Sequence, residues 1–310
     1  MNYKILCLTA VLVIVMISGC SSTKTTVTDD ANITPNVASD NGIIINSSVQ
    51  YPNIHANVTE ADITHRPKMA ATTVNNNGKK INAAVGRIAQ QYSYNWAGYS
   101  IDSTVGSVSD IQGSWIVPTV RTTTPKQYSC NWIGIDGDNS PTVEQIGTDS
   151  DTDSRGRPVY YAWYEFYPEP CYIIPMAISA GDKMSARVSY SDNNMTLSIV
   201  NQNTKKSFVV KHSADGYSRS SAEWITEAPY NNGILPLTNI GTTLFGQRYT
   251  FISGTCSATI DSVSRPIDSY QQNINTISMI NDKNEVKAQP SPLVNDTMGT
   301  SFNVAWVRAS

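Results

Sequence analysis

The sequence predicts an all-β fold for residues 91–310, and three observations support this class. Short segments rich in Val, Ile, Thr, Tyr and Trp recur between clusters of Gly, Asn, Asp, Ser and Pro, as in antiparallel strands joined by turns. No window of a dozen residues shows the apolar stripe of an amphipathic helix. The lack of helix–strand alternation over this length favours one large sandwich of antiparallel sheets.

Nine segments have the composition of strands and are bounded by turn residues. They are Asp110–Val117, Asn131–Asp136, Val159–Tyr167, Ala186–Tyr190, Thr196–Val200, Ser207–Lys211, Ala222–Glu227, Thr276–Ile280 and Ser301–Val307. The run Asp149–Asp153 resembles the start of a calcium loop, but it lacks the glycine and the glutamate of that motif. A polar hairpin tip is expected there, with a weak calcium site as the alternative.

Residues 1–19 have the features of a lipoprotein-type signal peptide. Lys4 precedes a largely apolar run, Ile5–Ile17, which is too short to span a bilayer comfortably. Ser18 and Gly19 then precede Cys20, which is similar to a lipobox. Cleavage before Cys20 would leave this residue to carry lipid and anchor the protein without spanning the membrane. The alternative is an ordinary signal peptide that ends near a cysteine.

Residues 20–90 have the composition of a tether. They are rich in Thr, Asn, Ser, Ala and Val, and Tyr51 is their single aromatic residue. Such a segment buries too little apolar surface to offset the entropy of the chain. It is expected to be either a flexible spacer or a removable pro-segment whose lysines and arginine cover an acidic site. The domain at 91–310 would then be exported, and it would face outward from the cell envelope or be released by processing of the tether.

Composition and charge exclude several classes of function. The formal net charge is −3, so no basic excess is available to bind nucleic acid. Three histidines and five cysteines occur without the spacing of common zinc motifs. No metal, cofactor or nucleic-acid partner is expected, and the chain is expected to be a monomer.

Strand parity gathers aromatic residues, acids and an amide on common faces, because side chains alternate along a strand. The residues that share such a face are Trp132 with Asp136, Gln145 with Gly147, Trp163 with Glu165, and Glu223 with Glu227. When a single strand shows this pattern, a solvent-exposed outer face of the sheet accounts for it. Large aromatics interleaved with acids on several strands are better suited to a substrate groove.

Five blocks, in this order and spacing, resemble those of the glutamic peptidases, or eqolisins. The blocks are Asn95–Tyr99, Trp132–Asp138, Val143–Gly147, Tyr161–Pro168 and Ser221–Glu227. The resemblance covers roughly residues 93–310. It implies a sandwich or jelly roll of two large, curved antiparallel sheets, similar to that of concanavalin A.

The same resemblance implies roles for particular residues. Gln145 and Glu227 match the catalytic glutamine and glutamate, and Glu223 matches a non-catalytic glutamate of the family. The positions that line or support the substrate groove are matched by Trp132, Asp136, Asp149, Trp163 and Glu165. The implied activity is that of an endopeptidase acting on proteins or peptides.

These two catalytic residue types suit hydrolysis in acid. An ionised Glu227 can take a proton from water, and the amide of Gln145 can donate to the developing oxyanion. A glutamate has a reference pKa of about 4.3 and stays ionised further into acid than histidine, at about 6.5. Glutamine does not titrate, so its donor remains available at any of these pH values.

Two further expectations concern an alternative function and a disulfide. Because jelly rolls also form lectins, a carbohydrate- or peptide-binding module on a lipoprotein stalk is the alternative function. Cys130, Cys171 and Cys256 remain in the predicted domain, and export permits disulfides. A Cys130–Cys171 bridge is expected because both residues adjoin strands of the predicted groove.

Overall fold

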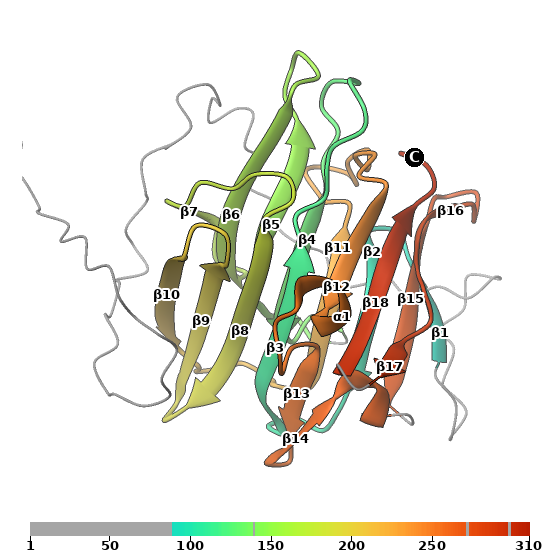
Figure 1. The fold of residues 1–310 in the computed structure, drawn as a ribbon. Helices are drawn as coiled ribbons and strands as arrows, with labels where there is room; N and C mark the ends of the chain where they lie inside the picture. Colours follow the sequence, from blue (N-terminus) through green and yellow to red (C-terminus); the bar gives the residue numbers. More distant parts are fainter. Residues whose placement is uncertain (1–88, 139, 271–272, 297–298) are drawn as a thin grey trace, which may run out of the picture. The chain divides into compact units, whose positions relative to one another are not determined.

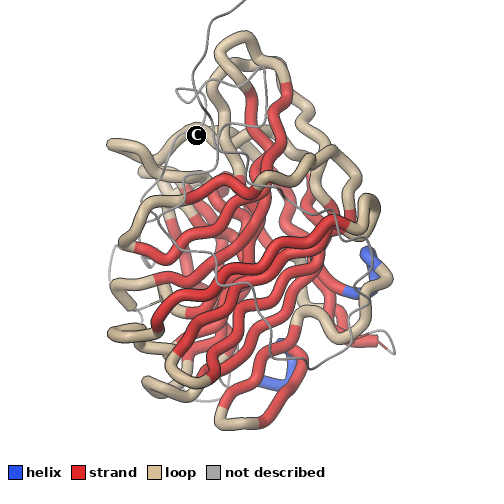
Figure 2. Tube along the Cα trace, turned by 90° about the vertical axis from the view of Figure 1, so that its left-hand side faces the viewer, coloured by secondary structure: helices blue, strands red, loops and turns tan. Residues whose placement is uncertain are grey.

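The computed structural model describes residues 89–138, 140–270, 273–296 and 299–310 (Figure 1). Helical structure in this part of the chain consists of α1 (Gln247–Thr250) and the 3-10 turn η1 (Ile267–Tyr270), and strands dominate the rest (Figure 2). No helix among the described residues is long and apolar enough to cross a membrane. The predicted all-β class is confirmed.

One layer of strands is antiparallel throughout and is built around β3. In order it contains β10 (Lys206–Ser213), β9 (Asn194–Asn201), β8 (Lys183–Ser191) and β3 (Val108–Ile116). The far edge of β3 pairs with β12 (Thr242–Gly246) and β13 (Ser257–Ile260). The layer continues from these to β14 (Val263–Pro266), β18 (Gly299–Trp306) and β17 (Val294–Asp296).

The second layer is built around β4. In order it contains β7 (Tyr172–Ile174), β6 (Pro158–Tyr167), β5 (Val143–Thr152), β4 (Cys130–Ile135), β11 (Ser221–Glu227), β2 (Trp96–Asp102), β15 (Ile274–Ile280) and β1 (Ala89–Ser93). The β1–β15 pair is parallel and the others are antiparallel. β16 (Val286–Pro290) pairs with both β15 and β18, so it joins the two layers.

The main hydrophobic core lies between the layers. Two buried tryptophans cross this interface: Trp115 on β3 donates to Thr148 Oγ1 on β5 at 2.8 Å, and Trp224 on β11 donates to the Gln112 carbonyl on β3 at 2.9 Å. The large apolar area of each indole is removed from water while its N–H keeps a partner. The predicted sandwich of antiparallel sheets is therefore what the structure contains.

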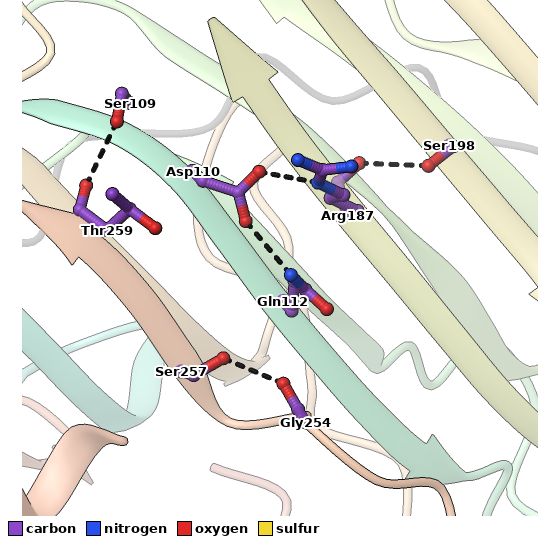
Figure 3. A network of polar contacts seen from close by, with 8 residues as sticks. All are labelled: Ser109, Asp110, Gln112, Arg187, Ser198, Gly254, Ser257 and Thr259. Atoms are coloured by element: carbon purple, nitrogen blue, oxygen red, sulfur yellow. Dashed lines mark hydrogen bonds and ion pairs between the residues drawn. The ribbon is translucent and has the colours of Figure 1, made fainter. Parts of the chain in front are cut away.

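The outward face of the first layer is polar. Arg187 Nε donates to Asp110 Oδ2 at 2.5 Å, and Gln112 Nε2 donates to Asp110 Oδ1 at 3.2 Å (Figure 3). Asp110 and Gln112 alternate along β3 with Ile111, which belongs to the core, and Arg187 lies on the neighbouring β8. Partly exposed ion pairs of this kind contribute little to stability. This face is in contact with solvent, and the predicted site residues lie elsewhere.

All nine predicted strands are present, with ends that shift by up to three residues. The expected hairpin tip at Asp149–Asp153 is wrong, because β5 continues to Thr152 and pairs with β6 up to Pro158. The tip lies just beyond, where Asp153 Oδ1 accepts the backbone N–H groups of Arg155 and Arg157. The described part of the chain contains no group of three side chains suited to a metal ion.

The predicted signal peptide, Cys20 and residues 20–88 of the predicted tether lie outside the described residues. β1 begins at Ala89, two residues before the boundary that the sequence predicts for the domain.

Candidate active site

The second layer carries a second apolar cluster on the face opposite the main core, and we call this the site face. Trp96 and Trp132 pack edge to face there, with ring centroids 5.1 Å apart. Trp163 and Ile225 extend the same cluster. The side chains on the site face are those of Trp96, Cys130, Trp132, Gln145, Asp149, Tyr161, Trp163, Glu165, Glu223, Ile225 and Glu227.

Strand register arranges these side chains in rows across the sheet. Glu227 on β11 pairs with Cys130 on β4, which pairs with Asp149 on β5. Gln145 on β5 pairs with Gly134 on β4. Thus β11 and β5 flank β4 on either side, and Glu227 and Gln145 lie on one face with their pairing positions four residues apart along β4. The row of Trp132 lies between them.

Two glycines make room for the Trp132 indole and its neighbours. A Cβ atom on Gly147 would lie 2.6 Å from Trp132 Cβ and 2.5 Å from the Asn131 carbonyl oxygen. A Cβ atom on Gly134 would lie 3.0 Å from the Trp132 ring and 3.1 Å from Gln145 Cβ. Side chains at these two positions would force the tryptophan and the glutamine apart, which explains the glycines on the site face.

Glu227 receives hydrogen bonds on both of its carboxylate oxygens. Trp132 Nε1 donates to Oε2 at 2.8 Å, and Asn95 Nδ2 donates to Oε1 at 3.5 Å. The thiol of Cys130 lies 3.8 Å from Oε2. Because hydrogen-bond donors to a carboxylate fix its orientation, Glu227 is held in place by groups from two other elements.

Glu223 lies on the same strand and the same face but has different surroundings. The Ser221 side chain and the Asp138 backbone favour its charged form, but burial outweighs them. Burial raises the pKa of Glu223 well above its usual value, and the nearby charges of Asp138 and Asp136 raise it further. Glu223 is therefore suited to remain a neutral acid.

Gln145 is oriented by the neighbouring strand. Its Nε2 donates to Glu165 Oε2 on β6 at 2.5 Å, and the two residues are direct partners in the ladder. Since Nε2 is the donor in this bond, the N–H₂ end of the amide faces Glu165. One N–H is committed to Glu165, and the geometry of the amide directs the second N–H elsewhere.

The row of Glu227 ends in a group of two acids and a phenol. Tyr161 donates from its hydroxyl to Asp149 Oδ2 at 2.8 Å and lies 3.0 Å from Asp151 Oδ2. Asp151 Oδ1 also accepts the backbone N–H of Ser129 at 3.0 Å. Asp149 therefore lies on the site face as the sequence predicts, in a hydrogen-bonded group with Tyr161.

Asp136 lies just beyond the end of β4, where strand parity no longer determines the face of its side chain. β4 ends at Ile135, and Asp136 adopts a left-handed conformation with φ 68°, so alternation stops before it. Its carboxylate accepts the backbone N–H groups of Arg219 at 2.7 Å and Ser220 at 2.8 Å, just before β11. In this position Asp136 fixes the start of the strand that carries Glu227.

The expected Cys130–Cys171 disulfide is wrong, because the structure contains no bond between the sulfur atoms of these two residues. Cys171 immediately precedes β7, and β5 and β6 separate β7 from the β4 strand of Cys130. Three strand spacings correspond to roughly 14 Å. That span is about twice the largest Cα separation that a disulfide bridges.

The chain is similar to known peptidases. The model of the Peptidase A4 family matches residues 94–289. Aspergillopepsin-2 from Aspergillus niger is 29% identical over 177 residues, and the match spans 48% of this chain and 61% of that protein.

Solved structures show the same fold. Scytalido-glutamic peptidase, solved with a transition-state analogue inhibitor, aligns with a TM-score of 0.56 at 24% identity. SCP-B, described as a member of the eqolisin family and solved with the tripeptide Ala-Ile-His, aligns with a TM-score of 0.54 at 23% identity. Each alignment covers 69% of this chain and 98% of the other.

Proposed function

Since the chain belongs to the Peptidase A4 family, the glutamic peptidases, we propose that it is an acid-active endopeptidase with Glu227 and Gln145 as its catalytic dyad. The observation that carries this proposal is the placement of these two side chains on one face, on strands that flank β4. Idealised strand dimensions put their Cα atoms roughly 16 Å apart. Between them lies the row of Trp132, across which a substrate peptide would extend.

In the proposed mechanism Glu227 is first a base and then an acid. Its carboxylate removes a proton from the bound water as the oxygen of that water attacks the peptide carbonyl carbon. The second N–H of Gln145 donates to the oxygen that becomes negatively charged, while Glu165 holds the first N–H. Glu227 then returns its proton to the leaving nitrogen, so the C–N bond breaks and the carboxylate is regenerated.

The titratable groups of the site face are compatible with activity in acid. Among the described residues, its titratable groups are carboxyls, thiols and phenols, with no histidine. A carboxylate base remains functional at a pH at which an imidazole would already be protonated. We therefore propose protein and peptide substrates that are cleaved in acid.

An assay on denatured protein tests the proposal directly. We expect the purified chain to cleave a denatured protein internally between about pH 3 and pH 5, and to lose this activity towards neutral pH. Mass spectrometry of the products distinguishes internal cleavage from trimming of the ends. Activity that rises steadily from acid to neutral pH would contradict the proposal, and binding of peptides or glycans without hydrolysis would favour the lectin-like alternative.

Export and lipid attachment are a separate proposal, since residues 1–88 lie outside the described part of the chain. We propose that Cys20 carries lipid and tethers the peptidase to the envelope. Metabolic labelling with an alkyne fatty acid should label the wild type and not Cys20→Ser. Equal labelling of both proteins would contradict attachment at Cys20.

A further inference from the structure

Asn95 lies in the short connection between β1 and β2, outside every strand, and yet it reaches Glu227. Its Nδ2 atom donates to Glu227 Oε1 at 3.5 Å, whereas Trp132 donates to the other oxygen at 2.8 Å. The two donors come from different elements, a turn and β4. Together they hold the carboxylate from both sides, which restricts rotation about its last side-chain bond.

The orientation of the Asn95 amide is determined by Ser93. The Ser93 hydroxyl donates to Asn95 Oδ1 at 3.0 Å, so the N–H₂ end of the amide must face Glu227. The same hydroxyl oxygen accepts the backbone N–H groups of Asn95 at 3.3 Å and Trp96 at 3.1 Å. Ser93 thus uses its one proton and two acceptor sites to fix the turn.

The backbone of this turn is also tied to its neighbours. Ala228, the residue after Glu227, donates its N–H to the Asn95 carbonyl at 2.8 Å. The buried ammonium group of Lys287 on β16 donates to the Tyr94 carbonyl at 3.4 Å. Burial lowers the pKa of Lys287 to about 8, so this group remains charged throughout the acid range. Asn95 is therefore held at a fixed position relative to Glu227.

We infer that Asn95 is a positioning residue for Glu227, held in place by the Ser93 turn, and that it aims the carboxylate at the attacking water. This inference rests on the proposed function of Glu227 as the base. Losing the Asn95 donor would loosen the hold on the carboxylate and let it turn away from the water. The loss should therefore appear in the chemical step rather than in substrate binding.

Two substitutions of Asn95 give different pH signatures. Asn95→Ala should lower kcat by about 10- to 100-fold while KM changes less than about twofold. Asn95→Asp introduces an acid of the same shape, which can donate only while it is protonated. Its kcat should approach that of the wild type at the lowest pH and fall progressively below it as the pH rises.

Dividing the kcat of each variant by that of the wild type at the same pH separates the effect of residue 95 from that of the other titrating groups. Those facing Glu227 from the packed strands are Cys130 on β4, Asp149 and Asp151 on β5, and Tyr161 on β6. Lys287 lies behind the turn. All of these groups are present in every variant, so the ratio of variant to wild type at each pH reports the new side chain.

Asn131→Ala is the matched control. Asn131 is fully buried and its Oδ1 accepts the hydroxyl of Thr226 at 2.7 Å, beside Glu227 in sequence but on the opposite face. This variant should lower the Tm and leave kcat near the wild-type value. Ser93→Ala removes the bond that orients the amide and the acceptor of two backbone N–H groups, but it keeps the Asn95 donor, so it should lower kcat less than Asn95→Ala does.

An Asn95→Ala protein with wild-type kcat, or a kcat loss that Asn131→Ala reproduces, would overturn the inference. If Asn95→Ala does not fold, Asn95→Asp and Ser93→Ala decide the matter, and a pH-independent ratio for Asn95→Asp would also overturn it. These results require an active wild type. A wild type without acid peptidase activity would instead refute the proposed function.

Discussion

Glu227→Gln should lower kcat for peptide hydrolysis in acid by about 10³-fold or more, because one side chain serves as both base and acid. Gln145→Ala should lower kcat by about 10²- to 10³-fold, which is the usual cost of losing an oxyanion donor. Initial rates on a quenched fluorescent peptide at saturating substrate measure both effects. Because the two residues act on one transition state, the double variant should be hardly slower than Glu227→Gln alone.

Glu223→Gln is the control for this pair of variants. Glu223 is on the same strand and face as Glu227, so a general disturbance of β11 would affect both substitutions alike. Its kcat should stay within about threefold of the wild type, since no transition-state contact is removed. Near-UV circular dichroism verifies that each variant keeps its tertiary packing. A Glu227→Gln enzyme with more than about a tenth of wild-type kcat would contradict the dyad assignment.

The face on which each predicted residue lies was largely predictable, because alternation is a local property of a strand. It places Trp132, Gln145 and Glu227 correctly within their own segments. The side-by-side arrangement of these segments is not local, since β4 pairs with β11, far along the chain. The aromatic residues and acids favoured a groove, and the resemblance to glutamic peptidases indicated which residues of these strands belong to it.

The sequence-based predictions fail where strand alternation ends, and where they depend on the distance between strands that are far apart in the sheet. Asp136 departs from alternation because its left-handed backbone ends β4. The Cys130–Cys171 bridge fails because two strands separate residues that both adjoin the same predicted groove. Asn95 carries no periodic signal, because its approach to Glu227 depends on a turn held by Ser93.

The protein should be more stable in acid than at neutral pH, in contrast to domains whose carboxylates are paired. Burial raises the pKa values of Glu223 and Glu144 well above normal, and it raises that of Asp138 to about 6, with the charge of Asp102 adding to the effect. Asp138 belongs to a buried network in which Ser100 donates to it at 2.6 Å. At a pH at which these carboxyl groups are already ionised in the unfolded chain, they are still protonated and neutral in the folded protein.

The direction of the pH dependence follows from proton counting. Below about pH 4 both states are protonated and the stability from these groups is fully present. Above that pH the unfolded chain releases protons that the folded state keeps, so stability falls by up to about 1.4 kcal/mol per pH unit for each group. For Asp138, the rise to about 6 corresponds to a loss of roughly 3 kcal/mol by that pH.

Glu223→Gln should therefore raise the Tm at pH 7 by several degrees and leave it nearly unchanged at pH 4. Glutamine has the shape of the neutral acid and cannot ionise, so the energy needed to keep Glu223 protonated, or to bury its charge, disappears. Differential scanning calorimetry at matched ionic strength between pH 4 and pH 7 measures the change. A Tm gain that is equal at both pH values would instead indicate better packing and would contradict the linkage argument.

Glu285→Gln is a control that should shift the Tm at neutral pH in the direction opposite to Glu223→Gln. The Asn281 side chain and Arg308 hold the pKa of this exposed carboxyl below its usual value, so it contributes stability only when it is ionised. Its replacement should cost a small amount of stability at pH 7 and nothing in acid. If Glu223→Gln and Glu285→Gln shifted the Tm in the same direction at neutral pH, net charge rather than burial would govern the pH dependence. Opposite shifts would show that the buried acids adapt this fold to the same acid range in which Glu227 is proposed to work.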